Sequence, residues 1–338
     1  MSHPLLVTGA AGFVGARFVE SCQKQGIPVI SVDQRDYFAD RPEHQNIDFG
    51  TIIDRDDVLS WLHEKNPPLS GIVHLGACAR TTELDEAFLF RNNVQFSQHL
   101  WNHASAKKLP FVYASSAATY GDGALGYDDD ESLFGQLKPL NPYGESKRLF
   151  DVWALEQEKT HHTPPSWCGL KFFNVYGFGE RHKGSMASVI LHAYDQILKT
   201  GGLKLFKSHK AGIADGHQER DFIYVDDVVK VLHFAWSKPI SRGVYNLGTG
   251  QARTFLALAK ATFKALSHEE KIDFIPTPEH LRDRYQYFTQ AKMDRLRQQG
   301  FLGEFTSLEK GAELYIARLR AFIPNDRLQP KSVRRQPQ

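Results

Sequence analysis

The 338-residue sequence has few cysteines and almost no excess of charge of either sign. Its three cysteines, Cys22, Cys78 and Cys168, lie far apart and show no CxxC spacing. Three thiols cannot all pair, so we expect reduced thiols, as in a cytoplasmic protein, and no metal site. A formal net charge of +2 gives no electrostatic reason to expect a nucleic-acid partner.

Long apolar segments are also missing from the chain. No apolar run approaches the ~18–20 residues that a membrane-spanning helix needs, so we expect no membrane partner. The first residues lead directly into PLLVTGAAGFVG, without the basic start and cleavage site of a signal peptide, which favours a cytoplasmic location. The last stretch, 323–338, is polar, basic and without apolar periodicity, and we expect a disordered tail there.

Short apolar runs alternate with longer amphipathic ones over the first half of the chain. Strands are predicted at 5–9, 28–33, 71–77, 110–116 and 168–177, and helices at 13–26, 85–106 and 141–157. This rhythm is typical of an α/β protein with a Rossmann-type, doubly wound parallel sheet. Residues 243–250 resemble a strand that returns to the sheet, and Asp226 and Asp227 are candidate N-caps for the helix after them.

The pattern also suggests how the chain is divided. We expect 1–174 to form the dinucleotide-binding domain, with 220–250 returning to it. Residues 175–219 and 251–322 then form a smaller, mixed α/β substrate-binding lobe, which contains a Gly/His/Lys-rich insert at 207–218. No internal repeat or long linker separates the two parts.

A glycine-rich turn lies between the first predicted strand and the first predicted helix. The segment TGAAGFVG contains Gly9, Gly12 and Gly15. Glycines there permit a tight turn and the close approach of a pyrophosphate, to which the helix N-terminus offers free N–H groups. A purely structural turn is the alternative, but the position after an N-terminal strand favours a dinucleotide site.

Charged residues after the second strand bear on the choice of cofactor. Asp33 ends that strand at the place where an acid binds the adenosine ribose, which favours NAD. Arg35, Arg41 and Arg55 follow, and any of them could reach a 2′-phosphate. Both NADP and NAD therefore stay open.

A serine, a tyrosine and a lysine form a second constellation. Ser115 and Ser116 end a predicted strand, and YGESK places Tyr143 and Lys147 four residues apart on one helix face. A nearby ammonium favours the phenolate, which makes proton abstraction by tyrosine feasible. The lysine can also hold the cofactor ribose, and a serine hydroxyl can bind the reacting oxygen.

With these three elements in this order, the chain resembles the extended short-chain dehydrogenase/reductase family from Leu5 to about Phe322. The resemblance implies a Rossmann fold, a nicotinamide cofactor and a nucleotide-sugar substrate. The 4,6-dehydratases of the family carry an Asp-Glu pair after the strand-end serine or threonine, and SSAATYG has none. This difference favours an epimerase over a dehydratase.

Six spaced motifs resemble the corresponding motifs in those family members that epimerise an ADP-heptose at C6″. They are HLGACARTTELD (74–85), YASSAATYG (113–121), NVYGFGERHKGSMAS (174–188), ERDFIYVDDV (219–228), NLGTG (246–250) and RYQYFTQA (284–291). The resemblance implies transient oxidation to an aldehyde and re-reduction with tightly bound NADP. It also implies a role in supplying heptose for lipopolysaccharide and a homo-oligomer, namely a homopentamer.

The same resemblance assigns residue roles. The catalytic residues that it implies are Ser116, Tyr143, Lys147 and Lys183, with Lys183 as the second acid/base. The cofactor-binding residues are Gly9, Gly12, Phe13, Val14, Gly15, Asp33, Gln34, Arg41, Arg55, Leu75, Gly76, Ala77, Cys78, Ala79, Asn92, Tyr143, Lys147, Val175 and Lys183. The substrate-binding residues are Ser116, Asn174, Ser185, His192, Phe206, Lys207, Ser208, His209, Arg220 and Tyr285.

Two other functions stay open. The chain could be another nucleotide-sugar epimerase or a dehydrogenase, because the 207–218 insert falls beside the predicted substrate pocket. A non-catalytic nicotinamide-binding regulator is the alternative outside enzymes. Such proteins commonly lose the tyrosine or the lysine, and both are present here. The resemblance assigns no role to Arg181 and His182, which precede Lys183 in the motif at 174–188.

Overall fold

A computed structural model describes residues 3–238, 240–282 and 285–322. The expected tail, 323–338, lies outside the described residues. The core is a seven-stranded sheet in which every neighbouring pair is parallel. In sheet order its strands are β10 (Gly243–Leu247), β6 (Trp167–Phe172), β5 (Phe111–Ser116), β4 (Gly71–His74), β1 (Leu5–Thr8), β2 (Val29–Asp33) and β3 (Thr51–Asp54).

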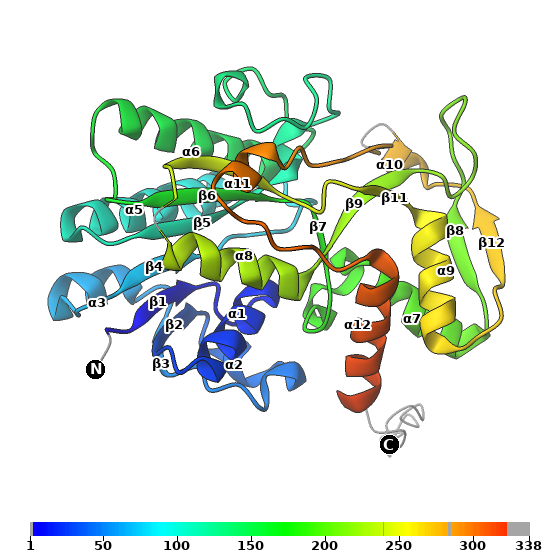
Figure 1. Ribbon diagram of the computed structural model, residues 1–338, viewed down its shortest axis with the longest axis horizontal. Coiled ribbons are helices and arrows are strands. Elements are labelled where there is room, and N and C mark those ends of the chain that lie inside the picture. The colour runs from blue at the N-terminus through cyan, green and yellow to red at the C-terminus, as the bar shows by residue number, and fades with distance from the viewer. Residues whose placement is uncertain (1–2, 239, 283–284, 323–338) are drawn as a thin grey trace, which may run out of the picture.

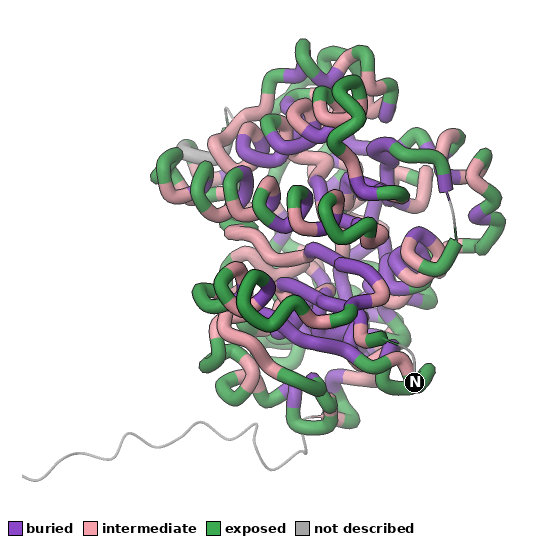
Figure 2. The backbone as a smooth tube through the Cα atoms, turned by 90° about the vertical axis from the view of Figure 1, so that its left-hand side faces the viewer, coloured by how far each residue is buried: buried purple, intermediate pink, exposed green. Residues whose placement is uncertain are grey.

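Helices cover both faces of this sheet, which confirms the predicted Rossmann-type architecture. Figure 1 shows α5 (Phe96–Lys107) and α6 (Pro142–Lys159) on one side, with α1 (Phe13–Lys24) and α8 (Val225–Ser237) on the other. α3 (Val58–Lys65) precedes β4. The buried backbone concentrates in the strands, and exposed residues lie on the outer surfaces of the helices (Figure 2).

A smaller second unit lies at the other end of the molecule (Figure 1). It contains a mixed sheet of β7 (Asn174–Tyr176), β9 (Glu219–Tyr224) and β11 (Ala252–Thr254), and a parallel pair of β8 (Leu203–Phe206) and β12 (Ile272–Ile275). Its long helices are α7 (Val189–Thr200), α9 (Phe255–Leu266) and α12 (Leu308–Phe322), and they bury a core of their own.

Short helical segments connect these elements. They are α2 (Asp36–Ala39), α4 (Glu86–Leu89), α10 (Glu279–Arg282), α11 (Asp294–Gln298), the 3-10 turns η1 (Pro42–His44), η3 (Ala117–Tyr120), η4 (Glu131–Leu133) and η5 (Arg181–Met186), and the π-helical η2 (Phe90–Gln95). Where the chain is described, no helix combines the length and the hydropathy that a membrane crossing requires.

Two details differ from the sequence-based expectation. The run 168–177 is not one strand, because β6 ends at Phe172 and β7 begins at Asn174 in the other sheet. The N-cap prediction for Asp226 and Asp227 is wrong: α8 begins earlier, its N-cap is Tyr224, and both acids lie in the first turn. Asp227 instead accepts hydrogen bonds from the Lys230 ammonium and from a backbone N–H at Thr306, both at 2.7 Å.

An aromatic cluster packs α5 and α6 against the sheet. Trp101 is fully buried, and its ring meets those of Trp167, Phe111 and Trp153 at 4.9–5.8 Å between centroids. We expect Trp101→Ala to lower the free energy of unfolding by about 3–5 kcal/mol, because a large cavity replaces the ring. Urea unfolding measures this change. Trp61→Ala, which removes a half-buried tryptophan, should lower the free energy of unfolding clearly less. Equal losses for the two variants would contradict the central place of Trp101 in the core.

Candidate active site

The glycine-rich turn forms a cradle at the carboxyl end of β1. Gly9 has a φ of 66°, and a Cβ there would lie 2.6 Å from the Gly76 nitrogen. A Cβ on Gly15 would lie 2.0 Å from the Gly9 carbonyl oxygen, so α1 packs too closely to β1 for any side chain. Gly12, the N-cap of α1, provides no side-chain cap. Free N–H groups therefore face the space above the turn, which fits the pyrophosphate of a dinucleotide.

Asp33 lies beside this cradle at the end of β2. Its carboxylate accepts N–H groups from Ala11 at 3.1 Å and from Gln34 at 2.9 Å. Burial raises the pKa of Asp33, whereas these two hydrogen bonds and the Arg41 and Arg55 charges lower it. Hydrogen bonds thus fix the carboxylate at the edge of the turn, where a ribose would bind.

Arg41 is the arginine that reaches the turn itself. Its guanidinium donates to the Ala11 carbonyl and lies 4.4 Å from the Tyr37 ring centroid. Arg55 pairs with exposed Asp56 at 3.2 Å, and Arg35 is exposed. Both Arg41 and Arg55 therefore lie near enough to Asp33 to lower its pKa. Of the three arginines, Arg41 is the one that contacts the glycine-rich turn.

The segment 75–79 follows β4 and lies against the same turn. Backbone N–H groups of Leu75 and Gly76 donate to the Thr8 carbonyl and hydroxyl at 3.0 and 3.1 Å. Asn93, which sequence reasoning missed, accepts from the Cys78 N–H at 2.8 Å and donates to the Cys78 carbonyl and to Ser146. Buried Asn93 therefore links this segment to α6. The predicted Asn92 instead donates to the Phe88 carbonyl at 2.8 Å.

The Ser–Tyr–Lys constellation meets where β5 ends and α6 begins. Ser116 is the last residue of β5, and Tyr143 lies in the first turn of α6, which Asn141 caps through the Gly144 N–H. Burial raises the pKa of Tyr143, and a hydrogen bond with Ser116 partly offsets the rise. Burial and Ser116 thus act on the pKa of Tyr143 in opposite directions, and burial has the larger effect.

Lys147 lies one turn later on α6 and is buried. Its ammonium donates to the Ala114 carbonyl of β5 at 3.0 Å. Burial lowers the pKa of Lys147 to about 8, whereas Asp151 and Cys78 act in the opposite direction. The pKa of Lys147 is thus lower than that of an exposed lysine because the side chain is buried.

Lys183 lies on η5, and a buried carboxylate holds it. The ammonium is 3.3 Å from Oε2 of Glu180 and 5.1 Å from the centroid of the Phe13 ring, next to the glycine-rich turn. Glu180 also accepts from the Ser188 N–H and hydroxyl and from the Tyr315 hydroxyl of α12. Among the described residues no hydrogen bond or ion pair joins Lys183 to Tyr143.

The neighbours of Lys183 point in different directions. Arg181 forms an exposed, bidentate ion pair with Asp195, at 2.9 Å for both contacts. Desolvation and the Arg41 and Lys183 charges lower the pKa of His182 to about 3, so its ring is neutral. Lys183 thus lies against Phe13 next to the glycine-rich turn, whereas Arg181 pairs with Asp195 at the surface and His182 is exposed.

Apart from Ser116 at the end of β5, the predicted substrate-binding residues lie in the second unit. Arg220 of β9 is buried between the rings of Phe255 and Tyr285, 5.6 and 5.5 Å from their centroids, and donates to the Gln286 carbonyl. His209 accepts the Thr277 N–H at 3.1 Å and holds the segment 206–209 beside β12. Asn174, Ser185 and His192 are exposed, and Val175 is half-buried.

The arrangement suits proton transfer beside a bound dinucleotide. The Gly-rich turn, Asp33, the 75–79 segment and Ser116 all lie at the carboxyl ends of neighbouring strands in one sheet. In open parallel sheets this edge is where ligands bind. In the part of the chain that is described, no group of His, Cys, Asp and Glu side chains has the arrangement of a metal site.

Known proteins resemble this chain over most of its length. The family described as the NAD dependent epimerase/dehydratase family matches residues 5–248. The ADP-L-glycero-D-manno-heptose-6-epimerase of Fusobacterium nucleatum is 44% identical, over 92% of this chain and 96% of that protein. The protein of the same name from Alkalilimnicola ehrlichii is 38% identical, over 92% and 96% of the two chains.

Solved structures give the same result. The ADP-L-glycero-D-manno-heptose-6-epimerase of Helicobacter pylori superimposes with a TM-score of 0.77 at 26% identity, covering 95% of this chain and 97% of that one. MoeE5 in complex with UDP-glucuronic acid and NAD superimposes with a TM-score of 0.74 at 26% identity, covering 95% and 100%.

Proposed function

Since the chain belongs to the NAD dependent epimerase/dehydratase family, we propose that this nucleotide-sugar epimerase converts ADP-D-glycero-D-manno-heptose into ADP-L-glycero-D-manno-heptose. The observation that carries the proposal is the convergence of the glycine-rich cradle with Ser116, Tyr143 and Lys147 at one sheet edge. The 38–44% identity to heptose 6-epimerases over 92% of the chain supports this substrate.

The residues around the cradle fit an NAD(P) cofactor. The N-terminus of α1 would hold the pyrophosphate, Asp33 the adenosine ribose, and Lys147 the nicotinamide ribose. When bound, the nicotinamide would supply a hydride acceptor and donor, so that C6″ of the heptose can be oxidised and reduced again. The oxidised carbon is a ketone and not the aldehyde expected from the resemblance, because C6″ carries two carbon substituents. Inversion at C6″ then leaves no net change of redox state.

Tyr143 and Lys183 serve as the two acid/base groups in this mechanism. Tyr143 exchanges a proton with the C6″ oxygen in one half-reaction, and Ser116 orients that oxygen through its hydroxyl. The C6″ oxygen points another way after the ketone turns, so a second group must exchange the proton. Lys183 fits this role because its ammonium lies above Phe13, at the start of α1. Glu180 holds that ammonium in place through an ion pair at 3.3 Å.

We also propose NADP as the preferred cofactor, because Arg41 reaches the glycine-rich turn. Arg41→Ala should weaken NADP binding roughly tenfold or more, since a charge-assisted hydrogen bond contributes about 1.5–3 kcal/mol. NAD binding should change little. Fluorescence titration with both cofactors measures this. Arg35→Ala removes one positive charge from an exposed side chain nearby and is the matched control. Equal losses for NADP and NAD would contradict the role of Arg41.

The other functions that the sequence leaves open differ in substrate. Incubation with ADP-, UDP-, GDP- and CDP-sugars separates the heptose epimerase from another epimerase or from a dehydrogenase, which would accumulate reduced cofactor. A non-catalytic regulator would turn over none of them. We propose a cytoplasmic homo-oligomer, a pentamer by resemblance, that supplies heptose for the lipopolysaccharide inner core. Equilibrium sedimentation tests the assembly.

A further inference from the structure

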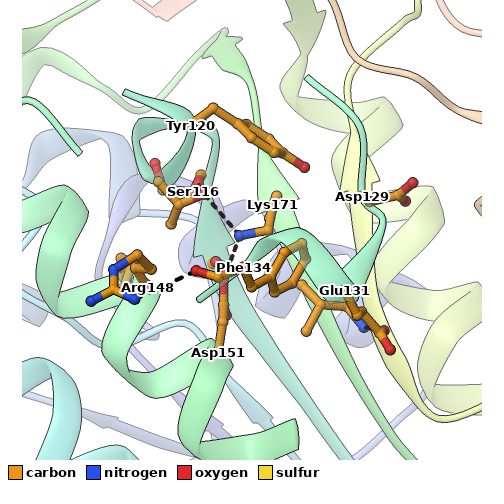
Figure 3. A network of polar contacts seen from close by, with 12 residues as sticks. Ser116, Tyr120, Asp129, Glu131, Phe134, Arg148, Asp151 and Lys171 are labelled. Atoms are coloured by element: carbon orange, nitrogen blue, oxygen red, sulfur yellow. Dashed lines mark hydrogen bonds and ion pairs between the residues drawn. The ribbon is translucent and has the colours of Figure 1, made fainter. Parts of the chain in front are cut away.

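A buried ion pair joins α6 to the sheet beside the Ser–Tyr–Lys group, and no step of the proposed reaction uses it. The Lys171 ammonium of β6 lies 2.6 Å from Oδ2 of Asp151 on α6, and the two side chains are 0% and 1% exposed. The same ammonium donates to the Thr119 hydroxyl at 2.8 Å and lies 4.1 Å from the centroid of the Phe134 ring (Figure 3). A buried charge pair of this kind needs all its hydrogen-bonding positions filled.

The remaining partners of Asp151 lie on the strand that carries Ser116. Tyr113 and Ser115 of β5 donate to the carboxylate at 3.0 and 2.7 Å. Between them, the Ala114 carbonyl accepts from Lys147, which lies one helical turn before Asp151. Three successive residues of β5 therefore bind the same two side chains of α6, which fixes the spacing between the strand end and the helix.

Hydrogen bonds through Thr119 also connect Lys171 to Ser116. Thr119, which accepts from Lys171, donates its hydroxyl hydrogen to the Ser116 carbonyl at 2.9 Å. One continuous network thus runs from the strand end at Ser116 through Thr119, Lys171 and Asp151 to α6. Figure 3 shows Ser116, Lys171 and Asp151 side by side.

The Asp151 carboxylate lies one helical turn after Lys147 on α6, and its negative charge raises the pKa of Lys147. Among the described residues Lys147 forms no ion pair, and the groups that face it are Asp151 on α6, Cys78 after β4 and His74 on β4. Burial lowers the pKa of His74 to about 3, so that ring is neutral. Of the other two, Asp151 acts more strongly than Cys78, and both oppose the effect of burial on the pKa of Lys147.

We propose that Asp151, held in place by Lys171, is a positioning residue of the reaction: it pins α6 to the end of β5 and supplies the counter-charge of the Lys147 ammonium. A purely structural ion pair would stabilise the fold without affecting the protonation of Lys147. The expected effect on turnover rests on the proposed function. The expected effect on the protonation of Lys147 does not, because it can be measured without any substrate.

The test measures the protonation of Lys147 directly. Lysines labelled with 13C at Cε are titrated by NMR, and the Lys147 signal is identified by its absence in Lys147→Met. The variant Asp151→Asn with Lys171→Met removes both charges of the pair, so that no unpaired buried charge remains. We expect the Lys147 midpoint to fall by at least one pH unit, which is a roughly tenfold change in the protonation equilibrium.

Two further variants complete the test. Asp151→Asn alone keeps the volume of the side chain and should give an equal or larger fall, which covers the case in which the double variant does not fold. Tyr113→Phe removes one uncharged donor from the same carboxylate and should leave the midpoint unchanged. An unchanged midpoint in a folded Asp151→Asn protein would overturn the inference.

The pH profile of turnover then separates the inference from the proposed function. If Lys147 acts in the reaction as an ammonium, the basic limb of kcat/KM should move to lower pH together with the NMR midpoint. A midpoint that falls while the basic limb stays in place would leave the inference standing and refute the proposed role of Lys147 in turnover.

Discussion

Tyr143→Phe is expected to lower kcat for epimerisation by about 10²–10⁴-fold, the range that a positioned general acid or base contributes. The change removes one hydroxyl, which is the only titratable atom of the side chain, and keeps the ring that packs at the start of α6. Cofactor should stay bound, because the glycine-rich turn and Lys147 are unchanged. Conversion is followed by chromatography of the two epimers, and bound cofactor by absorbance.

The control for this prediction removes a hydroxyl elsewhere in the same sheet. Tyr245 of β10 is buried, and its hydroxyl donates to the Ser241 carbonyl at 2.6 Å. Tyr245→Phe should keep close to full turnover while losing some stability. If Tyr143→Phe retained the turnover of Tyr245→Phe, Tyr143 would not be the acid/base of the reaction.

Lys183→Met is expected to lower kcat to a similar extent, by about 10²–10⁴-fold, because the second half-reaction loses its proton donor. Methionine keeps much of the length of the side chain and its contact with Phe13. Glu180 keeps its hydrogen bonds from Ser188 and Tyr315, so the loop should stay folded. The same chromatographic assay measures the loss, and thermal unfolding checks the fold.

Arg181→Met is the matched control for Lys183. It removes a positive charge two residues away in the same turn, from a side chain that pairs with Asp195 at the surface. Its turnover should stay near that of the unchanged protein, since exposed ion pairs contribute little. Full activity in Lys183→Met would refute the mechanism with two acid/base groups and leave Tyr143 as the single acid/base.

The sequence predicts the fold and the glycine-rich turn between β1 and α1 well because both depend on local patterns. Alternating apolar runs identify β1, β2, β4 and β5, and the similarity to heptose 6-epimerases deduced from six motifs is confirmed by the comparisons. The exposed edge strand β3 gives a weaker pattern, since its residues Thr51–Asp54 are only partly buried. The break between β6 and β7 depends on which sheet each strand joins, and periodicity does not show it.

Sequence reasoning missed residues whose role depends on partners distant in the chain. Asn93 contacts Cys78 and Ser146, and Glu180 contacts Tyr315, 135 positions away. The pairing of Asp151 with Lys171 across α6 and β6 is likewise invisible in either segment alone. The expectation that an ammonium favours the Tyr143 phenolate also needs three-dimensional context, because in the structure burial has the larger effect on that pKa and raises it.

The stereochemical fate of C6″ tests the central claim most directly. The purified protein, supplied with NADP, is incubated with ADP-D-glycero-D-manno-heptose that carries deuterium at C6″, and the products are analysed by NMR and mass spectrometry. We predict the L-glycero epimer with its deuterium retained, because hydride leaves and returns within one active site without exchange with water. No L-glycero product, or a product that has exchanged its deuterium for solvent hydrogen, would contradict a redox epimerase.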